Sequence, residues 1–213
     1  VYEVYGEFGC GKTQLCLSLA AESLAQGEPV VWIDCEDTFK PRRLREIMIA
    51  RELATEETVD EKLKNVKYFY TPNTEQLLGT VDSLSKLLLA IHPRIVILDG
   101  AIGQFREEYL GRGTLAERQN QIARLMTHIK NISFYFRCVV LFTNQVQSDP
   151  SVMFGDPVKP IGGNIVAHAS TYRVYLKKSG KKRIARMIDS PEHEQKDASY
   201  QLTIKGVEDA EKA

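Results

Sequence analysis

The first residues whose types and spacing could do chemistry are Gly6-Glu7-Phe8-Gly9-Cys10-Gly11-Lys12-Thr13. They fit the pattern G-x-x-x-x-G-K-[ST], in which glycines let successive backbone N–H groups curl around phosphate oxygens. Lys12 would reach the β- and γ-phosphates of a nucleotide, and the Thr13 hydroxyl would ligate Mg²⁺. The segment therefore predicts a binding site for a nucleoside triphosphate with Mg²⁺.

The context of this pattern agrees with that interpretation. The pattern alone occurs by chance in about one chain in a hundred of this length. Here a predicted strand over residues 1–5 precedes it, and a predicted helix closed by Gly27 follows it. A helix N-terminus at this place adds the positive potential that a phosphate group requires.

Carboxylates follow two further predicted strands. Asp99 closes the clearest predicted buried strand, where an enzyme with a phosphate loop places its second Mg²⁺ anchor. Asp34 and Glu36 follow another apolar run, on the same edge of a parallel sheet. A carboxylate there can orient and deprotonate the water that attacks the γ-phosphate. Spacing alone does not separate Glu36 from Asp34 or Asp37.

The order of the predicted elements defines the fold class. Strand and helix patterns alternate along most of the chain, and its last fifty residues change to strands joined by turns. This order predicts an α/β fold with a mostly parallel, doubly wound sheet and antiparallel C-terminal strands. The predicted strands cover 1–5, 30–33, 66–70, 95–98, 138–142, 171–176, 183–188 and 199–204. The predicted helices begin near Lys12, Pro41, Thr58, Thr74 and Thr114, with Thr74 expected to cap its helix and Thr58 and Thr114 opening capping boxes.

Two stretches, 100–113 and 147–163, are predicted to be irregular, and loops of this length inside a compact domain are usually functional. A chain of 213 residues with 43% hydrophobic residues can bury one core, so a single domain over 1–213 is expected. The abrupt start inside an apolar run indicates a fragment.

Charge and apolar runs restrict the class of protein. Lys+Arg and Asp+Glu are equal at 28 each, so contacts with nucleic acid must come from local basic clusters. Apolar runs are far too short for a membrane span, and no leader sequence opens the chain. We therefore expect no membrane partner and an intracellular location.

The four cysteines, Cys10, Cys16, Cys35 and Cys138, show no metal-ligand spacing. Small buried side chains in a reducing compartment are the simplest interpretation. For Cys10, proximity to a helix N-terminus suggests a second hypothesis, namely that the pKa of its thiol is lowered.

Five segments together resemble the ATPase core of the archaeal RadA and eukaryotic strand-exchange recombinases, within the RecA-like superfamily. They are residues 6–14, 32–39, 105–119, 143–146 and 160–171. The blocks at 105–119 and 160–171 are specific to this subfamily. The resemblance implies a RecA-like P-loop NTPase core over 1–213, with the family's upstream helical DNA-binding domain and polymerisation peptide absent.

The resemblance implies a catalytic set and a nucleotide site. Glu36 resembles the catalytic base and Gln145 the γ-phosphate sensor, with Lys12 as the third catalytic residue. Thr13 and Asp99 are the expected ligands of Mg²⁺, and Arg43 occupies the position that stacks on adenine. The residues expected to bind ATP are Gly6, Glu7, Phe8, Gly9, Cys10, Gly11, Lys12, Thr13, Gln14 and Arg43.

The resemblance also implies DNA and subunit contacts. The stretch 100–113 matches the first DNA-binding loop, with Arg106, Arg112 and Gly113, and 147–163 matches the second, with Gly162 and Gly163. Alternatively, Arg112 is a solvated loop arginine without a role in DNA binding. His168, Asp189 and Pro191 are expected at contacts between subunits of a filament, although His168 could also be a packing histidine.

Several positions depart from the family pattern. Asp37 replaces glycine or asparagine, Gly100 replaces serine, and Gln104 stands where histidine or a hydrophobic residue is common. Phe69 replaces a small residue beside the family's self-association pocket, and residues 192–196 lack the family's pattern. These departures leave the geometry of the subunit contacts open.

The sequence therefore predicts the DNA-dependent ATPase core of a strand-exchange protein that binds ATP, Mg²⁺ and single- and double-stranded DNA. Self-association into filaments and contacts with recombinase mediators are expected of the full-length protein. The alternative is a recombinase paralogue that acts as an assembly mediator without strand exchange. A hexameric helicase or clock-type ATPase, and a small-molecule kinase, fit the motifs less well. The location would be cytoplasmic in an archaeon, which the loop residues favour, or nuclear in a eukaryote.

Overall fold

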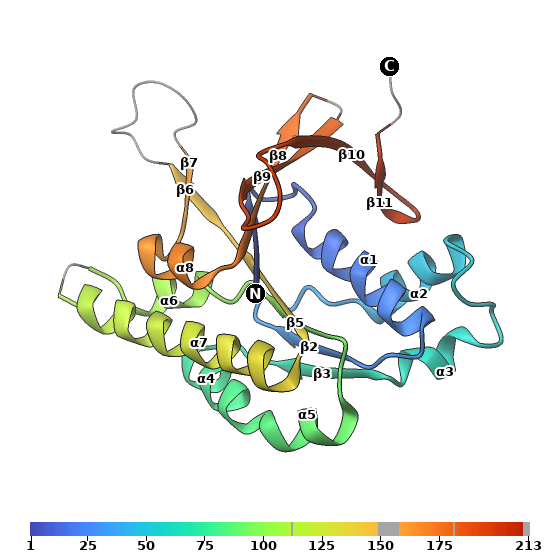
Figure 1. Ribbon diagram of the computed structural model, residues 1–213, viewed down its shortest axis with the longest axis horizontal. Coiled ribbons are helices and arrows are strands. Elements are labelled where there is room, and N and C mark those ends of the chain that lie inside the picture. Colours follow the sequence, from blue (N-terminus) through green and yellow to red (C-terminus); the bar gives the residue numbers. More distant parts are fainter. Residues whose placement is uncertain (112, 149–157, 181, 211–213) are drawn as a thin grey trace.

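A long mixed sheet with helices on both faces forms the framework of the chain (Figure 1). The computed structural model describes residues 1–111, 113–148, 158–180 and 182–210. Within these residues the main sheet has the strand order β11-β10-β9-β8-β1-β5-β4-β2-β3. Its strands are β1 (Tyr2–Gly6), β2 (Val30–Asp34), β3 (Val66–Tyr70), β4 (Ile95–Asp99), β5 (Val139–Asn144), β8 (Tyr172–Ser179), β9 (Lys182–Asp189), β10 (Asp197–Thr203) and β11 (Gly206–Asp209).

The sheet is parallel from β8 through β1, β5, β4 and β2 to β3, whereas β8 to β11 pair antiparallel. Every residue of β2 and β4 is buried, because helices cover both faces of these central strands. The predicted α/β class, with a mostly parallel sheet and antiparallel C-terminal strands, is confirmed.

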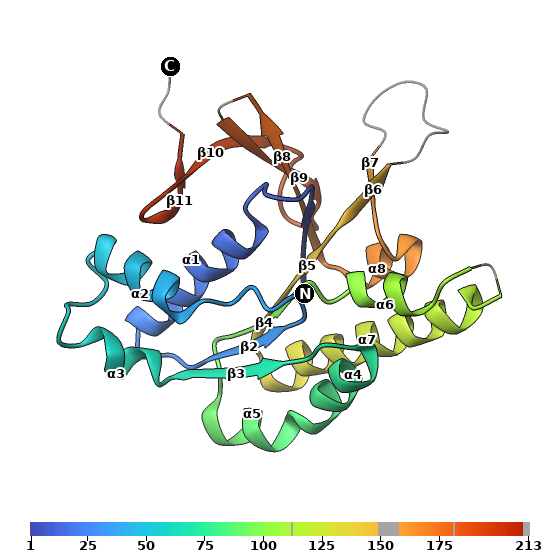
Figure 2. The same ribbon diagram turned by 180° about the vertical axis from the view of Figure 1, so that it is seen from behind.

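Two layers of helices enclose the sheet (Figures 1 and 2). On one face α1 and α2 pack around Trp32, and on the other face α4, α5 and α7 pack around Phe142. The helices are α1 (Lys12–Ala25), α2 (Pro41–Ala50), α3 (Val59–Leu63), α4 (Thr74–Ser83), α5 (Ser85–Ile91), α6 (Gly103–Glu108), α7 (Leu115–Phe136) and α8 (Gly163–Ala169). Across the described ranges, every helix is too short or too polar to cross a bilayer.

The predicted helix caps are wrong in detail. Asn73, not Thr74, caps α4, because its side chain accepts a hydrogen bond from the Gln76 N–H at 2.8 Å. The Glu108 carboxylate binds both the backbone N–H and the hydroxyl of Thr74, so that hydroxyl has a tertiary partner. Neither Thr58 nor Thr114 makes a side-chain cap, since no hydrogen bond runs from the helix start to either hydroxyl.

The two stretches predicted to be irregular contain regular structure. The first includes α6, and the second is flanked by a two-stranded ribbon of β6 (Val146–Ser148) and β7 (Val158–Pro160). The ribbon and the β8–β9 hairpin stand at the same end of the molecule, opposite α5 (Figures 1 and 2). Elements this short carry no measurable periodicity, so the sequence pattern did not indicate them.

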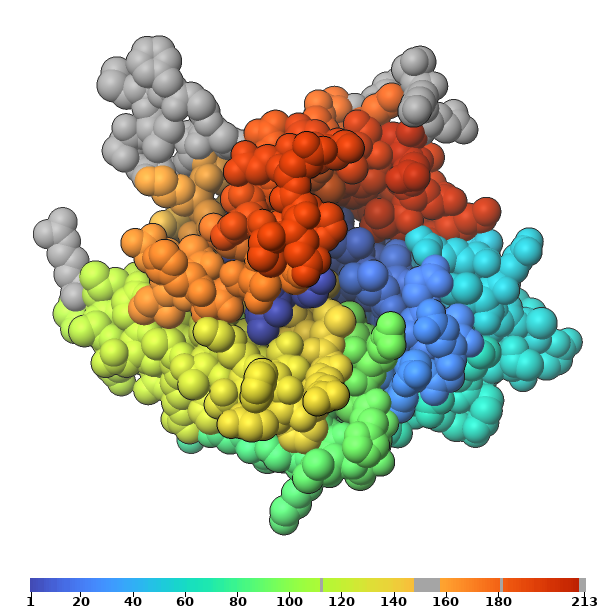
Figure 3. Space-filling view, in the orientation of Figure 1, coloured from blue at the N-terminus to red at the C-terminus, as the bar shows by residue number. Residues whose placement is uncertain are grey.

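The C-terminal strands fold back onto the helices that follow the phosphate loop. The Arg51 guanidinium donates to the carbonyls of Lys205 and Val207, at 2.7 and 2.5 Å. Gly206 has φ +85°, and a Cβ there would lie 2.4 Å from the Ser18 hydroxyl. The red C-terminal strands therefore lie against blue α1 and cyan α2 on the surface (Figure 3).

A buried polar network joins three strands of the sheet. Glu3 on β1 is fully buried, and its carboxylate accepts hydrogen bonds from Arg173 Nε at 2.7 Å and from Asn144 Nδ2 at 2.8 Å. Asn144 Nδ2 also donates to the Ile161 carbonyl at 2.8 Å. This network fixes the segment after β7 to the end of β5.

Replacing Glu3 with glutamine should destabilise the fold by about 3 kcal/mol, because the partly buried Arg173 would lose its counter-charge and the glutamine N–H would face one of the two donors that Glu3 now accepts from. Urea unfolding measures this change. Glu56→Gln removes one partner of the exposed ion pair with Arg45 and serves as the control, with an expected loss below about 1 kcal/mol. Equal losses in the two variants would contradict the importance of the buried network.

Candidate nucleotide site

Four neighbouring parallel strands deliver the predicted site residues to one edge of the sheet. The phosphate loop follows β1, Gln145 follows β5, Asp99 ends β4, and Glu36 follows β2 by two residues. The strand register pairs Asp34 with Asp99. The sequence therefore identified a set of residues that the fold brings together.

The phosphate loop has the backbone that its glycines allow. Gly9 and Gly11 have φ values of +71° and +110°, a region that other residues rarely adopt. A Cβ on Gly6 would lie 2.1 Å from the Leu176 carbonyl oxygen. The Lys12 ammonium donates to the carbonyls of Gly6 at 2.8 Å and Glu7 at 3.1 Å. This conformation holds a cation at the loop, as a phosphate site requires.

Cys10 lies inside the loop rather than on its surface. Its side chain is fully buried, and burial raises the pKa of the Cys10 thiol. The hypothesis of a lowered pKa is therefore wrong, because desolvation outweighs the nearby Lys12 charge. The Tyr200 hydroxyl donates to the Cys10 carbonyl at 2.7 Å, which ties the loop to β10. Phe8 and Glu7, in contrast, are exposed.

Asp99 combines burial with hydroxyl partners. Its carboxylate accepts from the Thr143 hydroxyl at 2.6 Å and the Thr38 hydroxyl at 3.1 Å, and a hydrogen bond also joins it to Thr13. Burial raises the pKa of Asp99, and these hydrogen bonds oppose the shift. Carboxylate and hydroxyl oxygens suit Mg²⁺ as ligands. The donor set of Asp99 and Thr13 therefore fits the ion that the sequence predicts.

Asp34 organises the loop after β2. Its buried carboxylate accepts from the N–H groups of Glu36 at 3.1 Å, Thr38 at 3.2 Å and Phe39 at 2.9 Å. The Tyr68 hydroxyl donates to it at 3.3 Å. Because all of these donors belong to the protein, Asp34 acts as a structural residue and not as an acceptor for a proton from water.

The other two carboxylates of this segment differ in their surroundings. Asp37 has a left-handed backbone with φ +55° and an exposed side chain 3.7 Å from the Lys40 ammonium. Glu36 instead accepts a hydrogen bond from Gln145 Nε2 at 2.7 Å. The geometry thus favours Glu36 among the three carboxylates that the sequence left open.

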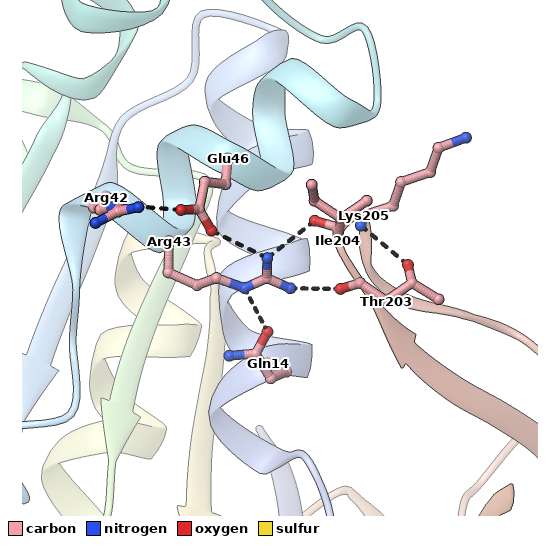
Figure 4. A network of polar contacts seen from close by, with 7 residues as sticks. All are labelled: Gln14, Arg42, Arg43, Glu46, Thr203, Ile204 and Lys205. Carbon is pink, nitrogen blue, oxygen red and sulfur yellow. Dashed lines mark hydrogen bonds and ion pairs between the residues drawn. The ribbon is translucent and has the colours of Figure 1, made fainter.

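Arg43 on α2 is fixed by four partners beside the start of α1 (Figure 4). Its guanidinium donates to Gln14 Oε1 at 3.0 Å, to Glu46 Oε2 at 3.4 Å and to the carbonyls of Thr203 at 2.6 Å and Ile204 at 3.1 Å. The turn between β10 and β11 therefore sets the plane of the guanidinium. The sequence did not indicate that this turn contributes to the site, because its contacts come from backbone carbonyls, which every type of residue has.

The predicted DNA residues lie on two segments near this edge. Arg106 is exposed on α6, and Gly113 is exposed before α7. Gly162, with φ +94°, caps α8, and Gly163 is its first residue. Arg112 lies outside the described residues, as do residues 149–157 of the predicted second loop.

The predicted subunit-contact residues lie at the surface. His168 is exposed in the last turn of α8, which argues against a packing histidine, and Asp189 and Pro191 are exposed at the end of β9 and beyond it. Phe69 is half-buried and packs against the core beneath α4 and α5. Its ring occupies space on that face of the edge strand β3.

The comparisons with known proteins agree with this geometry. The Rad51 family model matches residues 1–210. The chain belongs to the Rad51 family. It is 40% identical over 218 residues to the DNA repair and recombination protein RadA of Cenarchaeum symbiosum, covering 99% of the chain and 54% of that relative. It is 40% identical over 225 residues to the protein of the same name from Methanocorpusculum labreanum, covering 97% of the chain and 68% of that relative.

The resemblance predicted from the sequence is thus confirmed, and the helicase and kinase alternatives find no support in these matches. The chain spans about half the length of the first relative, at 54%.

Replacing Asp34 with alanine should destabilise this Rad51-family chain by about 3 kcal/mol or more, because three backbone donors and the Tyr68 hydroxyl would lose their buried acceptor. Chemical unfolding monitored by circular dichroism gives this value. Asp37→Ala removes an exposed neighbouring carboxylate and should change stability by less than about 0.5 kcal/mol. A small loss for Asp34→Ala would contradict its structural role.

Proposed function

We propose that this chain is the ATP-hydrolysing core of a strand-exchange protein that binds Mg²⁺-ATP and single-stranded DNA during recombination and repair. The hydrogen bond between Glu36 and Gln145 is the observation that carries the proposal. It joins a carboxylate able to activate water to a residue just before the predicted second DNA loop. The names of the two RadA relatives support the biological context.

The phosphate loop supports ATP as the ligand. The backbone of Gly6 to Thr13 would bind the phosphates, and the Lys12 ammonium would exchange its two loop carbonyls for phosphate oxygens. Thr13 and Asp99 would hold Mg²⁺, which neutralises phosphate charge when bound. Arg43 would stack on adenine, because its guanidinium is already fixed in one plane.

Glu36 would act as the base. Its side chain is exposed at the sheet edge, so it can hold a water molecule and accept its proton as the water attacks the γ-phosphate. The Gln145 amide restrains one carboxylate oxygen. A change at Gln145 would therefore alter the position of the base.

Gln145 also supports a link between hydrolysis and DNA. Its carbonyl accepts a hydrogen bond from the Ile161 N–H at 3.0 Å, and β6 begins at the next residue. Gln145 thus lies just before the predicted second loop and is hydrogen-bonded to Ile161 near the other end of that loop. DNA bound by this loop would shift Gln145 and so regulate hydrolysis.

Assembly into filaments belongs to the same proposal. The exposed residues His168, Asp189 and Pro191 would meet a neighbouring subunit, which places the nucleotide between protomers. Double-stranded DNA and recombinase mediators are the further partners, and the cell interior is the location. Since the net charge is zero, DNA contacts would come from local groups such as Arg106.

Glu36→Gln should abolish DNA-stimulated ATP hydrolysis, with a loss of about a hundredfold or more in kcat, because glutamine cannot accept the proton. ATP binding should persist, since the phosphate loop is unchanged. The measurement is ATP turnover with and without single-stranded DNA, on the complete natural polypeptide. Asp37→Asn, which alters the adjacent exposed carboxylate, should retain activity.

Wild-type protein that binds ATP but does not hydrolyse it, with or without DNA, would contradict the proposed activity. That result would favour the alternative function, an assembly mediator that binds ATP and a recombinase partner.

Arg43→Lys should weaken ATP binding about five- to tenfold and leave the binding of inorganic tripolyphosphate unchanged, because lysine loses the planar stacking surface while the phosphate loop is intact. Calorimetric titration of both ligands separates the two effects. Arg42→Lys is the matched control, since Arg42 is exposed and contacts Glu46. Equal weakening for both ligands would contradict the proposal that Arg43 stacks on adenine.

A further inference from the structure

Gly100 leaves open the space that Glu36 occupies. Its φ is +84°, and a Cβ built there would lie 2.5 Å from Glu36 Cγ, 2.7 Å from Cδ and 2.8 Å from Oε1. Real Cβ atoms essentially never approach other heavy atoms below 3.0 Å. With this backbone conformation, a side chain at position 100 would therefore force the Glu36 carboxylate to move.

The backbone of Gly100 is held in place. Its N–H donates to the Thr143 hydroxyl at 2.7 Å, and that hydroxyl in turn donates to Asp99 at 2.6 Å. Its carbonyl accepts from the Gly103 N–H at 3.3 Å. Because Gly100 is fixed from both sides, a side chain at this position would displace Glu36 and not the main chain. That displacement would break the hydrogen bond from Gln145 to Glu36.

Gln104 holds the residue before Glu36. Its side chain is buried, and Nε2 donates to the carbonyls of Cys35 at 2.9 Å and Thr71 at 2.5 Å. The N–H of Cys35 donates to the Asp99 carbonyl at 2.9 Å. The backbone N–H and the carbonyl of Cys35, the residue before Glu36, are thus both held by hydrogen bonds.

Gly100 and Gln104 depart from the family pattern, and both act on the same short segment. We propose that they are positioning residues for Glu36, Gly100 by leaving room for its carboxylate and Gln104 by holding the Cys35 carbonyl. The proposal rests on the proposed role of Glu36 in hydrolysis. Gln104 and the exposed Arg106 both lie on α6, so this helix connects the predicted first DNA loop to the segment that holds Glu36.

The kinetic test compares alanine substitutions at two glycines with similar positive φ values. Gly27 has φ +78° and nothing within 4 Å of a Cβ, so Gly27→Ala is a matched control for Gly100→Ala. In the complete natural polypeptide with single-stranded DNA, Gly100→Ala should lower kcat about a hundredfold and leave KM for ATP within about twofold. Gly27→Ala should leave both values unchanged. Equal kcat values in the two variants would overturn the role of Gly100.

A double-mutant cycle tests the contact independently of hydrolysis. Gly100→Ala should lower the melting temperature by more degrees than Gly27→Ala does. In a Glu36→Ala background this excess should disappear, because the colliding atoms Cγ, Cδ and Oε1 are gone. An excess that persists without the Glu36 side chain would overturn the proposed contact.

Gln104→Met provides a second variant that does not disturb Gly100. It removes both hydrogen bonds and should lower kcat about tenfold or more at unchanged KM. Gln201→Met is its control, since the Gln201 amide donates to the Asp209 carbonyl on the outer strands. Wild-type kcat in Gln104→Met would overturn the role of Gln104. If the wild-type protein hydrolyses no ATP, the proposed function fails, while the melting cycle still supports or overturns the contact.

Discussion

The register that pairs Asp34 of β2 with Asp99 of β4 puts two buried carboxylates side by side, and the rest of the site depends on it. A carboxylate in a protein interior is costly unless donors satisfy it. Asp34 meets this constraint with three backbone N–H groups and a tyrosine hydroxyl, which determines the path of the chain after β2. Asp99 meets it with hydroxyls, which a cation can replace as partners. Asp34 therefore organises the loop after β2, whereas Asp99 has hydroxyl partners that a cation can replace.

This division explains why Glu36 lies where it does. The N–H of Glu36 is bound to Asp34, so its backbone is fixed while its side chain extends beyond the edge of the sheet. Gly100 leaves room for that side chain, and Gln145 restrains its carboxylate. Three strands thus contribute to the position of one carboxylate, which is possible because their carboxyl ends share an edge. Exposure of the side chain allows contact with water, as a base requires.

Much of the framework could be predicted from the sequence, because central strands and the phosphate loop have strong local patterns. The uninterrupted apolar runs of β2 and β4 reflect burial on both faces. The cap expected at Thr74 was wrong because a tertiary contact, the Glu108 carboxylate, supplies its partner, whereas the hydroxyls of Thr58 and Thr114 bond to local groups before their helices. The choice between Asp34, Glu36 and Asp37 was open for a similar reason. Three carboxylates within four residues cannot be told apart by residue type and spacing. Their different partners in the folded chain distinguish them.

At the end of β5, two adjacent residues contact different parts of the molecule, one a buried network and the other the proposed base. Asn144 is the last residue of β5 and Gln145 follows it, and the two side chains have different partners. Asn144 joins the buried Glu3–Arg173 pair, whereas Gln145 contacts Glu36. Ile161 is bonded to both residues, through its carbonyl to Asn144 and through its N–H to Gln145. The segment after β7 is therefore attached to a rigid buried network and to the proposed base at once. Under the proposed function, DNA bound by the predicted second loop would shift Gln145 while the buried network holds Asn144 in the sheet, as coupling of DNA binding to hydrolysis would require.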